Sequence, residues 1–193
     1  HGARLGWGMV KTASLVLALY WAARFLVLGR EETARRDPAA MRLFVWVMAW
    51  TMGWTALGLW GGDAMRALGL GGAVMATGFT AFALTLVLDV LLAPWKVASA
   101  LGDPGVGFLG SMRRVGLSFW WGLLLFFMVV LPPMVVHYAL SFLAMGRPEW
   151  LAWLLLALDS LVVGYLAAVM AAVTVAIARR AGNRAGRPLA PGA

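Results

Sequence analysis

Four ionisable residues interrupt apolar stretches that are otherwise long enough to cross a membrane: Arg24, Asp89, His137 and Asp159. An ionisable group in hydrocarbon costs at least ~2.5–3.5 kcal/mol on insertion-based scales, so each one should have a partner or a function. Such groups line proton, ion or substrate pathways in some membrane proteins, and in others they join neighbouring helices. These four residues are therefore the first candidates for chemistry in this chain.

Depth along the helices predicts one ion pair, between Arg24 and Asp89. Asp89 lies seven residues before Lys96, which is roughly 10 Å of helix rise from the predicted cytoplasmic interface. Arg24 lies at a similar depth before Arg30. Since the two residues share a depth and carry opposite charges, we expect them to pair.

Hairpin symmetry predicts a second pair, between His137 and Asp159. Both lie at the same distance in sequence from Pro148, in the predicted outer loop, so antiparallel helices would hold them at one depth. Either pair has two interpretations: a polar clasp that fixes the register of the helices, which is the simpler one, or part of a proton or substrate pathway. Two isolated pairs on opposite halves of the membrane are fewer groups than a relay needs.

Other chemistry finds few residues to support it. The chain has no cysteine, which excludes disulfides, thiolate metal sites and cysteine nucleophiles. His137 is the only histidine within a predicted span, so haem held by two histidines of this chain is excluded, while a single pigment on His137 stays open. The glycine-rich segment 95–114 offers only Asp103 and Ser111 to catalysis. We expect neither an enzyme nor a metal site.

The elements that must position these residues are membrane-spanning helices. Residues 43–62, 67–88, 115–146 and 160–178 contain no Asp, Glu, Lys or Arg, and each stretch matches or exceeds the roughly 17–25 residues that a helix needs to cross a bilayer. Hydrophobic residues make up 63% of the chain, and the mean hydropathy is +0.85. We predict an all-α, polytopic transmembrane helix bundle in one domain over residues 1–178, with five spans at 9–29, 41–61, 70–94, 115–143 and 150–178.

Two segments are predicted to lie outside the membrane. Residues 95–114 read as the one substantial loop, because their glycines and Pro104 interrupt any regular pattern. Residues 179–193 read as a basic, flexible tail that is rich in glycine and proline.

The basic residues alternate between the two sides of these spans, and the richer side should face the cytoplasm. The poorer side holds Arg4, Arg66 and Arg147, with Lys11 nearby. The richer side holds Arg30, Arg35, Arg36, Arg42, Lys96, Arg113, Arg114, Arg179, Arg180, Arg184 and Arg187. The carboxyl-terminal tail is therefore predicted to be cytoplasmic. Five spans then place His1 outside, and we expect a six-helix parent with one further helix upstream.

The net charge of +8 could also suggest a nucleic-acid partner. The basic residues lie in short loops and a tail and do not form a face interleaved with aromatic residues. Membrane topology explains the charge, and no nucleic acid is expected.

Pro132 and Pro133 fall within the charge-free stretch 115–146, which is longer than one straight crossing requires. Proline removes a hydrogen bond from a helix and clashes with the preceding turn, so the fourth span should kink or break there. A break would expose backbone carbonyls at membrane depth, as transporters use for ion sites. A packing kink is the simpler interpretation.

Two stripes along the predicted helices indicate packing surfaces. A small residue recurs at every fourth position of the fifth span, which lets another backbone approach closely: Gly164, Ala168, Ala172 and Ala176. Bulky residues recur with the same spacing on the second span: Trp46, Trp50 and Trp54. The tryptophans could cradle a lipid tail, a carotenoid or a chlorin ring, but a ridge that faces lipid or a partner is the simpler interpretation.

A resemblance rests on about half of the chain, residues 88–180. The run LDVLLAPWKVASALGDPGVGFLGSMRRVGLSFWWGLLLFFMVVLPP, followed by two long apolar helices, resembles a group of bacterial six-helix inner-membrane proteins. That group includes the membrane domain attached to some glycerophosphodiester phosphodiesterases. Pro94, Gly102, Asp103, Ser111 and Gly116 occupy places comparable to those in its loose motif, whereas the arginine often found before the Leu-Pro step is absent. The resemblance implies a six-helix fold and the bacterial inner membrane, but no activity or functional residues.

The sequence thus favours a non-enzymatic accessory or scaffolding subunit that packs against lipid, pigment, another membrane protein or a second copy of itself. The alternative is a transporter or channel-like permease that uses a proline-broken fourth helix with His137, Asp159 and Asp89. Bound lipid is expected in either case.

Overall fold

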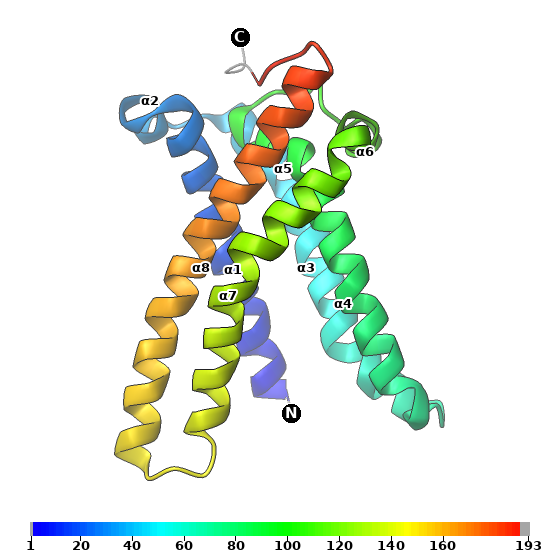
Figure 1. Ribbon diagram of the computed structural model, residues 1–193, viewed down its shortest axis with the longest axis vertical. Helices are drawn as coiled ribbons and strands as arrows, with labels where there is room; N and C mark the ends of the chain where they lie inside the picture. The colour runs from blue at the N-terminus through cyan, green and yellow to red at the C-terminus, as the bar shows by residue number, and fades with distance from the viewer. Residues whose placement is uncertain (1, 190–193) are drawn as a thin grey trace.

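The computed structural model describes the backbone of residues 2–189 and the side chains of residues 6–116 and 118–189. This part of the chain is all-α, as predicted (Figure 1). Its elements are α1 (Gly2–Leu28), α2 (Arg30–Ala34), α3 (Pro38–Ala67), the 3-10 turn η1 (Gly71–Ala73), α4 (Val74–Leu91), α5 (Ala93–Leu101), α6 (Phe108–Val115), the 3-10 turn η2 (Gly116–Ser118), α7 (Phe119–Ala144) and α8 (Glu149–Arg184).

Five helices within residues 2–189 are long and apolar enough to cross a membrane: α1, α3, α4 together with η1, α7 and α8. The prediction of a five-span polytopic membrane protein is confirmed. The last helix ends at Arg184 and not at residue 178, and Ala181 and Gly182 on its final turns are buried. The segment 179–184 therefore belongs to the bundle and not to a flexible tail. Residues 185–189 follow the end of this helix, and residues 190–193 of the predicted tail lie outside the described residues.

The five long helices form two hairpins and a single helix. α3 and α4 make one hairpin, α7 and α8 make the other, and α1 packs against both α3 and α8. Figure 1 shows the two hairpins converging at the end of the molecule that holds α5 and α6 and separating toward the opposite end. The bundle is therefore closed at one end and splayed at the other.

The short helix α5 is the most completely buried element of the structure. Every one of its residues except Trp95 is buried, and it packs against α1, α3, α6 and α8. The prediction that residues 95–114 form an irregular loop is thus wrong, whereas their position outside the membrane stays a prediction. The glycines of this segment bound two helices: Gly102 ends α5 in a left-handed conformation, and Gly107 precedes α6. The segment therefore fills the core between the long helices at this end of the bundle.

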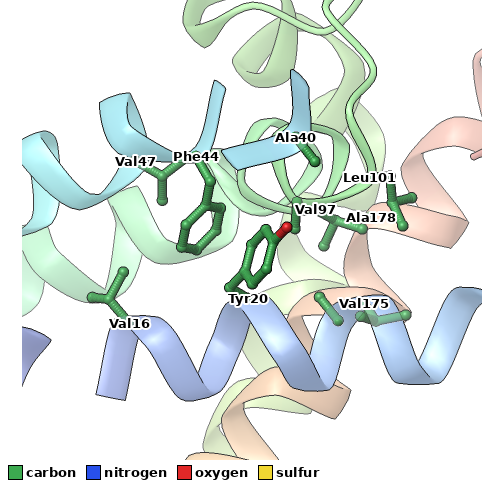
Figure 2. Close-up of a cluster of buried hydrophobic side chains, with 11 residues drawn as sticks. Val16, Tyr20, Ala40, Phe44, Val47, Val97, Leu101, Val175 and Ala178 are labelled. Atoms are coloured by element: carbon green, nitrogen blue, oxygen red, sulfur yellow. The ribbon is translucent and has the colours of Figure 1, made fainter. Parts of the chain in front are cut away.

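Two clusters of apolar side chains form that core. In the first, Tyr20 of α1 and Phe44 of α3 lie with ring centroids 5.0 Å apart, beside Val97 of α5 and Val175 of α8 (Figure 2). The second joins α4, α7 and α8, and there Gly122 is required: a Cβ at this position would lie 2.9 Å from Val90 Cγ1 and 3.3 Å from Ile177 Cγ1. Both clusters lie toward the closed end of the bundle.

Ser111 of α6 joins α4 to α5. Its fully buried hydroxyl accepts a hydrogen bond from the backbone N–H of Trp95 at 3.0 Å and donates one to the carbonyl oxygen of Leu91 at 2.8 Å. In an unbroken helix these two backbone groups would bond to each other. The serine hydroxyl therefore satisfies both groups at the point where the chain turns from α4 into α5.

Arg24 connects three elements at the closed end. It is 3% exposed, and its Nη1 donates to Asp37 Oδ2 at 3.2 Å and to the carbonyl oxygen of Ala100 at 3.0 Å. Asp37 in turn caps α3 by accepting from the backbone N–H of Ala40. That N–H lowers the pKa of the Asp37 carboxyl, and Arg24 lowers it further against the opposing effect of burial, so Asp37 is ionised at neutral pH.

The predicted pair between Arg24 and Asp89 is wrong. Arg24 pairs with Asp37, and Asp89 pairs with Lys96. A similar depth in the sequence does not fix which way a side chain points around its helix. The turn after Leu91 also brings Lys96 back toward Asp89, which a continuous helix with a spacing of seven residues would not allow at this distance.

Gly102 should tolerate no side chain. Its φ is +81°, and a Cβ there would lie 3.3 Å from Asp37 Oδ2 and 3.6 Å from the Ala40 Cβ. Gly69 is a matched control, since its φ is +76° and a Cβ there would meet nothing within 4 Å. We expect Gly69→Ala to lower the free energy of unfolding by ~1 kcal/mol and Gly102→Ala by ~2 kcal/mol or more. Unfolding in mixed micelles, followed by circular dichroism, measures both, and equal losses would contradict the close approach at Gly102.

Candidate functional site

A cavity of about 310 Å³ lies between the two hairpins and α1. It is lined by side chains of α1, α3, α4, α5, α7 and α8, so every membrane-spanning helix contributes to it. Most of its wall is apolar, with long side chains from α1, α7 and α8 that include Leu15, Leu19, Phe126, Met134, Leu166 and Met170. A cavity inside a membrane domain that draws on all its helices is the first place to look for a function.

The cavity is elongated along the bundle. On α8 its lining runs from Val163 to Ile177, which at 1.5 Å per residue corresponds to ~20 Å. Lys11, His137 and Tyr138 line it toward the splayed end, and Asp89 and Lys96 line it toward the closed end. The apolar middle therefore separates two groups of titratable side chains.

The predicted pair between His137 and Asp159 is confirmed. His137 Nδ1 lies 2.5 Å from Asp159 Oδ1, and the two side chains are 17% and 12% exposed. The pair joins α7 to α8 where these helices run antiparallel, as the hairpin symmetry predicts. His137 lines the cavity, whereas Asp159 lies behind it and fixes the orientation of the imidazole ring.

The second pair joins α4 to α5. Lys96 Nζ lies 2.5 Å from Asp89 Oδ1, and both side chains border the cavity. Their charges compensate each other in a region where an unpaired charge would be costly. The cavity thus adjoins two pairs of ionisable side chains, which lie at different depths.

Lys11, Lys96, Tyr138 and the threonines of the wall are site residues that sequence reasoning missed. In the sequence, Lys11 and Lys96 indicate only the membrane interface, and the threonines show no pattern that would indicate a site. The spacing of seven residues between Asp89 and Lys96 could have suggested the pair only if the turn at Leu91 had been recognised. Pro94, shortly after that turn, was the available signal.

The predicted tryptophan ridge does not form one cradle. Trp46 is 70% exposed, whereas the rings of Trp50 and Trp54 stack at 6.2 Å. Trp50 packs edge-on against Phe108, and Trp54 Nε1 donates to Thr85 Oγ1 at 2.7 Å. Because one ring faces outward and two pack against α4 and α6, the three tryptophans do not surround a common ligand, and none of them lines the cavity.

The small-residue stripe of α8 faces away from the rest of the chain. Gly164, Ala168 and Ala172 are exposed, Ala176 is half-buried, and a Cβ on Gly164 would meet nothing within 4 Å. The close helix approach that this stripe permits is therefore not used between the described helices.

Of the two predicted outcomes at Pro132 and Pro133, a kink or a break, the break is not formed. Both prolines lie inside α7, which runs without interruption from Phe119 to Ala144. Figure 1 shows α7 changing direction partway along its length, so the helix bends and does not open. Neither proline lines the cavity. Hydrocarbon offers no water to satisfy freed backbone groups, and the helix keeps its remaining hydrogen bonds.

Within the described part of the chain, no group of three or more His, Cys, Asp or Glu side chains could hold a metal ion. A single pigment on His137 stays a prediction.

Comparison with known proteins gives no match: no protein-family model, no curated protein and no solved structure matches the chain. The resemblance to bacterial six-helix inner-membrane proteins therefore stays a prediction, and the function must be argued from the site alone.

The Asp89–Lys96 pair should stabilise the fold mainly by sparing Lys96 an unpaired charge. We expect Asp89→Leu to lower the free energy of unfolding by roughly 2–3 kcal/mol, less than for a fully buried pair because the Asp89 side chain is 25% exposed. The double variant Asp89→Leu/Lys96→Met should recover most of that loss, because it leaves no charge behind. Unfolding in mixed micelles measures both, and a double variant no more stable than the single one would contradict this account.

Proposed function

We propose that this membrane protein is a permease whose central cavity forms the path of a small solute. One observation carries the proposal: a single cavity adjoins two pairs of ionisable side chains, Asp89–Lys96 and His137–Asp159. A clasp that only fixes helix register needs no cavity beside it and is better sealed from one. Ionisable residues that face a cavity within a membrane are typical of substrate and proton pathways.

The two ends of the cavity carry different ionisable side chains, which can have different roles along such a path. At the splayed end, the Asp159 carboxylate lies against the His137 imidazole, a side chain that can carry a proton on either ring nitrogen. The Asp89–Lys96 pair at the closed end can open to hold either sign of charge. The proline-broken helix of the sequence-based alternative has no part in this proposal, because α7 is continuous.

The packing supports movement at the splayed end. Among the described residues α3 makes almost no contact with α7 or α8, and the α3–α4 and α7–α8 hairpins meet chiefly near α5. Rocking one hairpin against the other about the closed end would open the cavity without disturbing the core.

We place the closed end in the cytoplasm of a bacterial cell, with the tail on the same side. The support is the charge distribution, because the ends of α1 and α8, together with α2, α5 and α6, carry most of the basic residues.

The His137–Asp159 pair should be required for proton-coupled flux. We expect proteoliposomes of the unaltered chain to acidify under an imposed pH gradient, as read by an internal pH-sensitive dye, and Asp159→Asn and His137→Ala to reduce the rate about tenfold or more. Glu149→Gln is the matched control, since Glu149 lies at the exposed start of the same helix and away from the cavity. A rate equal to that of empty vesicles, or one unchanged in both variants, would refute the proposal.

A second candidate function is that of an accessory or scaffolding subunit. The exposed stripe on α8 favours it, since Gly164, Ala168 and Ala172 leave a smooth surface on which a second copy or another membrane protein can pack closely. Lipid would cover this surface in the absence of a partner.

Bulky residues on the stripe should abolish such an association. We expect the chain to purify in mild detergent as an oligomer or with partner chains, and Gly164→Leu/Ala168→Leu to release the monomer. Ala157→Leu is the control, because Ala157 is exposed on α8 but lies outside the stripe. Light scattering measures the mass of each, and a monomer without partners in the unaltered chain would exclude this function.

A further inference from the structure

The body of the cavity offers a ligand almost no free polar groups. Thr12, Thr51 and Thr174 line it, but each hydroxyl donates to a carbonyl oxygen four residues earlier in its own helix. The remaining wall is made of leucine, valine, isoleucine, methionine, alanine and phenylalanine side chains. A ligand that fills this length of ~20 Å must therefore present an apolar chain to it.

The charges on the wall leave one cation uncompensated. Lys96 is neutralised by Asp89, and Asp159 is occupied by His137. Lys11 lies at the other end of the cavity from Lys96, on α1, and has no ion-pair or hydrogen-bond partner among the described side chains. Lys11 is exposed at the edge of the cavity, so its ammonium group can meet the acidic group of a ligand whose apolar chain fills the cavity.

We propose that the occupant of this cavity is a single-chain amphipathic anion, an alkyl carboxylate or alkyl phosphate, with its acidic group on Lys11 and its chain running toward Ile177. This inference rests on the cavity being the ligand site of the proposed function and names the class of its solute. An uncharged chain of the same length would leave Lys11 without a partner. An alkyl ammonium would place its positive charge beside that of Lys11. Met134 of α7 and Met170 of α8 line the cavity, and their flexible side chains adapt it to chains of different shape.

His137 and Tyr138 lie at the same end as Lys11 and add to the site. An anion held by Lys11 would also lie at the end of the cavity where the His137 imidazole stands. Binding of the anion and of a proton at this end are therefore expected to favour each other, which links this ligand class to proton coupling.

The test is equilibrium binding of radiolabelled dodecanoate to the full chain in nanodiscs of zwitterionic lipid, with empty discs to subtract partitioning into the bilayer. Unlabelled dodecanoate and dodecyl phosphate should displace it at concentrations about tenfold lower than dodecanol, and dodecylammonium should not displace it. The ratio between the two anions tells a carboxylate site from a phosphate site. If dodecanol displaces the label as effectively as the two anions do, the proposal is overturned by this experiment on the unaltered chain alone.

Three variants locate the site. Lys11→Gln should weaken dodecanoate binding about tenfold, and Lys11→Arg should retain it, because the arginine keeps the charge. Ala167→Phe fills the cavity and should abolish binding, whereas Ala157→Phe, on an exposed position of the same helix, should leave it unchanged. Unchanged binding in Lys11→Gln or in Ala167→Phe would overturn the assignment.

The two proposals fail in different ways. Dodecanoate binding that depends on Lys11, without proton flux in proteoliposomes, would refute the permease and keep the anion site. Proton flux that Ala167→Phe blocks, with no binding of either anion, would refute the anion site and keep the permease.

Discussion

The buried guanidinium of Arg24 is the constraint on which the closed end of this bundle depends. A cation removed from water needs compensation, and here it comes from the Asp37 carboxylate and from the carbonyl oxygen of Ala100. The Asp37 carboxylate stands at the start of α3, where it faces the positive end of that helix dipole. The Ala100 carbonyl lies in the last turn of α5, at the negative end of that helix dipole, which favours the guanidinium. Three elements far apart in sequence are thereby fixed at one point.

That fixed point explains why α5 is buried. The helix is short, it ends at Gly102 directly against Asp37, and its start is held by the Ser111 hydroxyl from α6. With both ends satisfied, its apolar residues can fill the space between α1, α3 and α8 without leaving unpaired backbone groups inside the bundle. The irregular backbone of this protein therefore lies between α4 and α5, where a hydroxyl repairs it, and not at the paired prolines of α7.

Closure at one end leaves the other end open, and the cavity follows from this asymmetry. The core clusters lie near α5, and toward the splayed end the two hairpins lose contact with each other. The ion pairs face the resulting space because each pair joins neighbouring helices on its rim: α4 with α5, and α7 with α8. The same arrangement gives the cavity an apolar middle and charged ends. A ligand with an apolar chain and a charged end group therefore suits it.

Much of this protein is determined by its sequence alone. The absence of charge over membrane-length stretches requires helices, since only a helix or a closed barrel satisfies its backbone in hydrocarbon, and this decided the all-α class and the five spans. The His137–Asp159 pair was also within reach, because two helices joined by a short loop hold symmetric positions at one depth. Tertiary structure alone decided the partner of Arg24, the burial of α5 and the existence of the cavity. Each of these depends on the directions that side chains take around their helices and on contacts between segments distant in sequence, and neither composition nor depth encodes them.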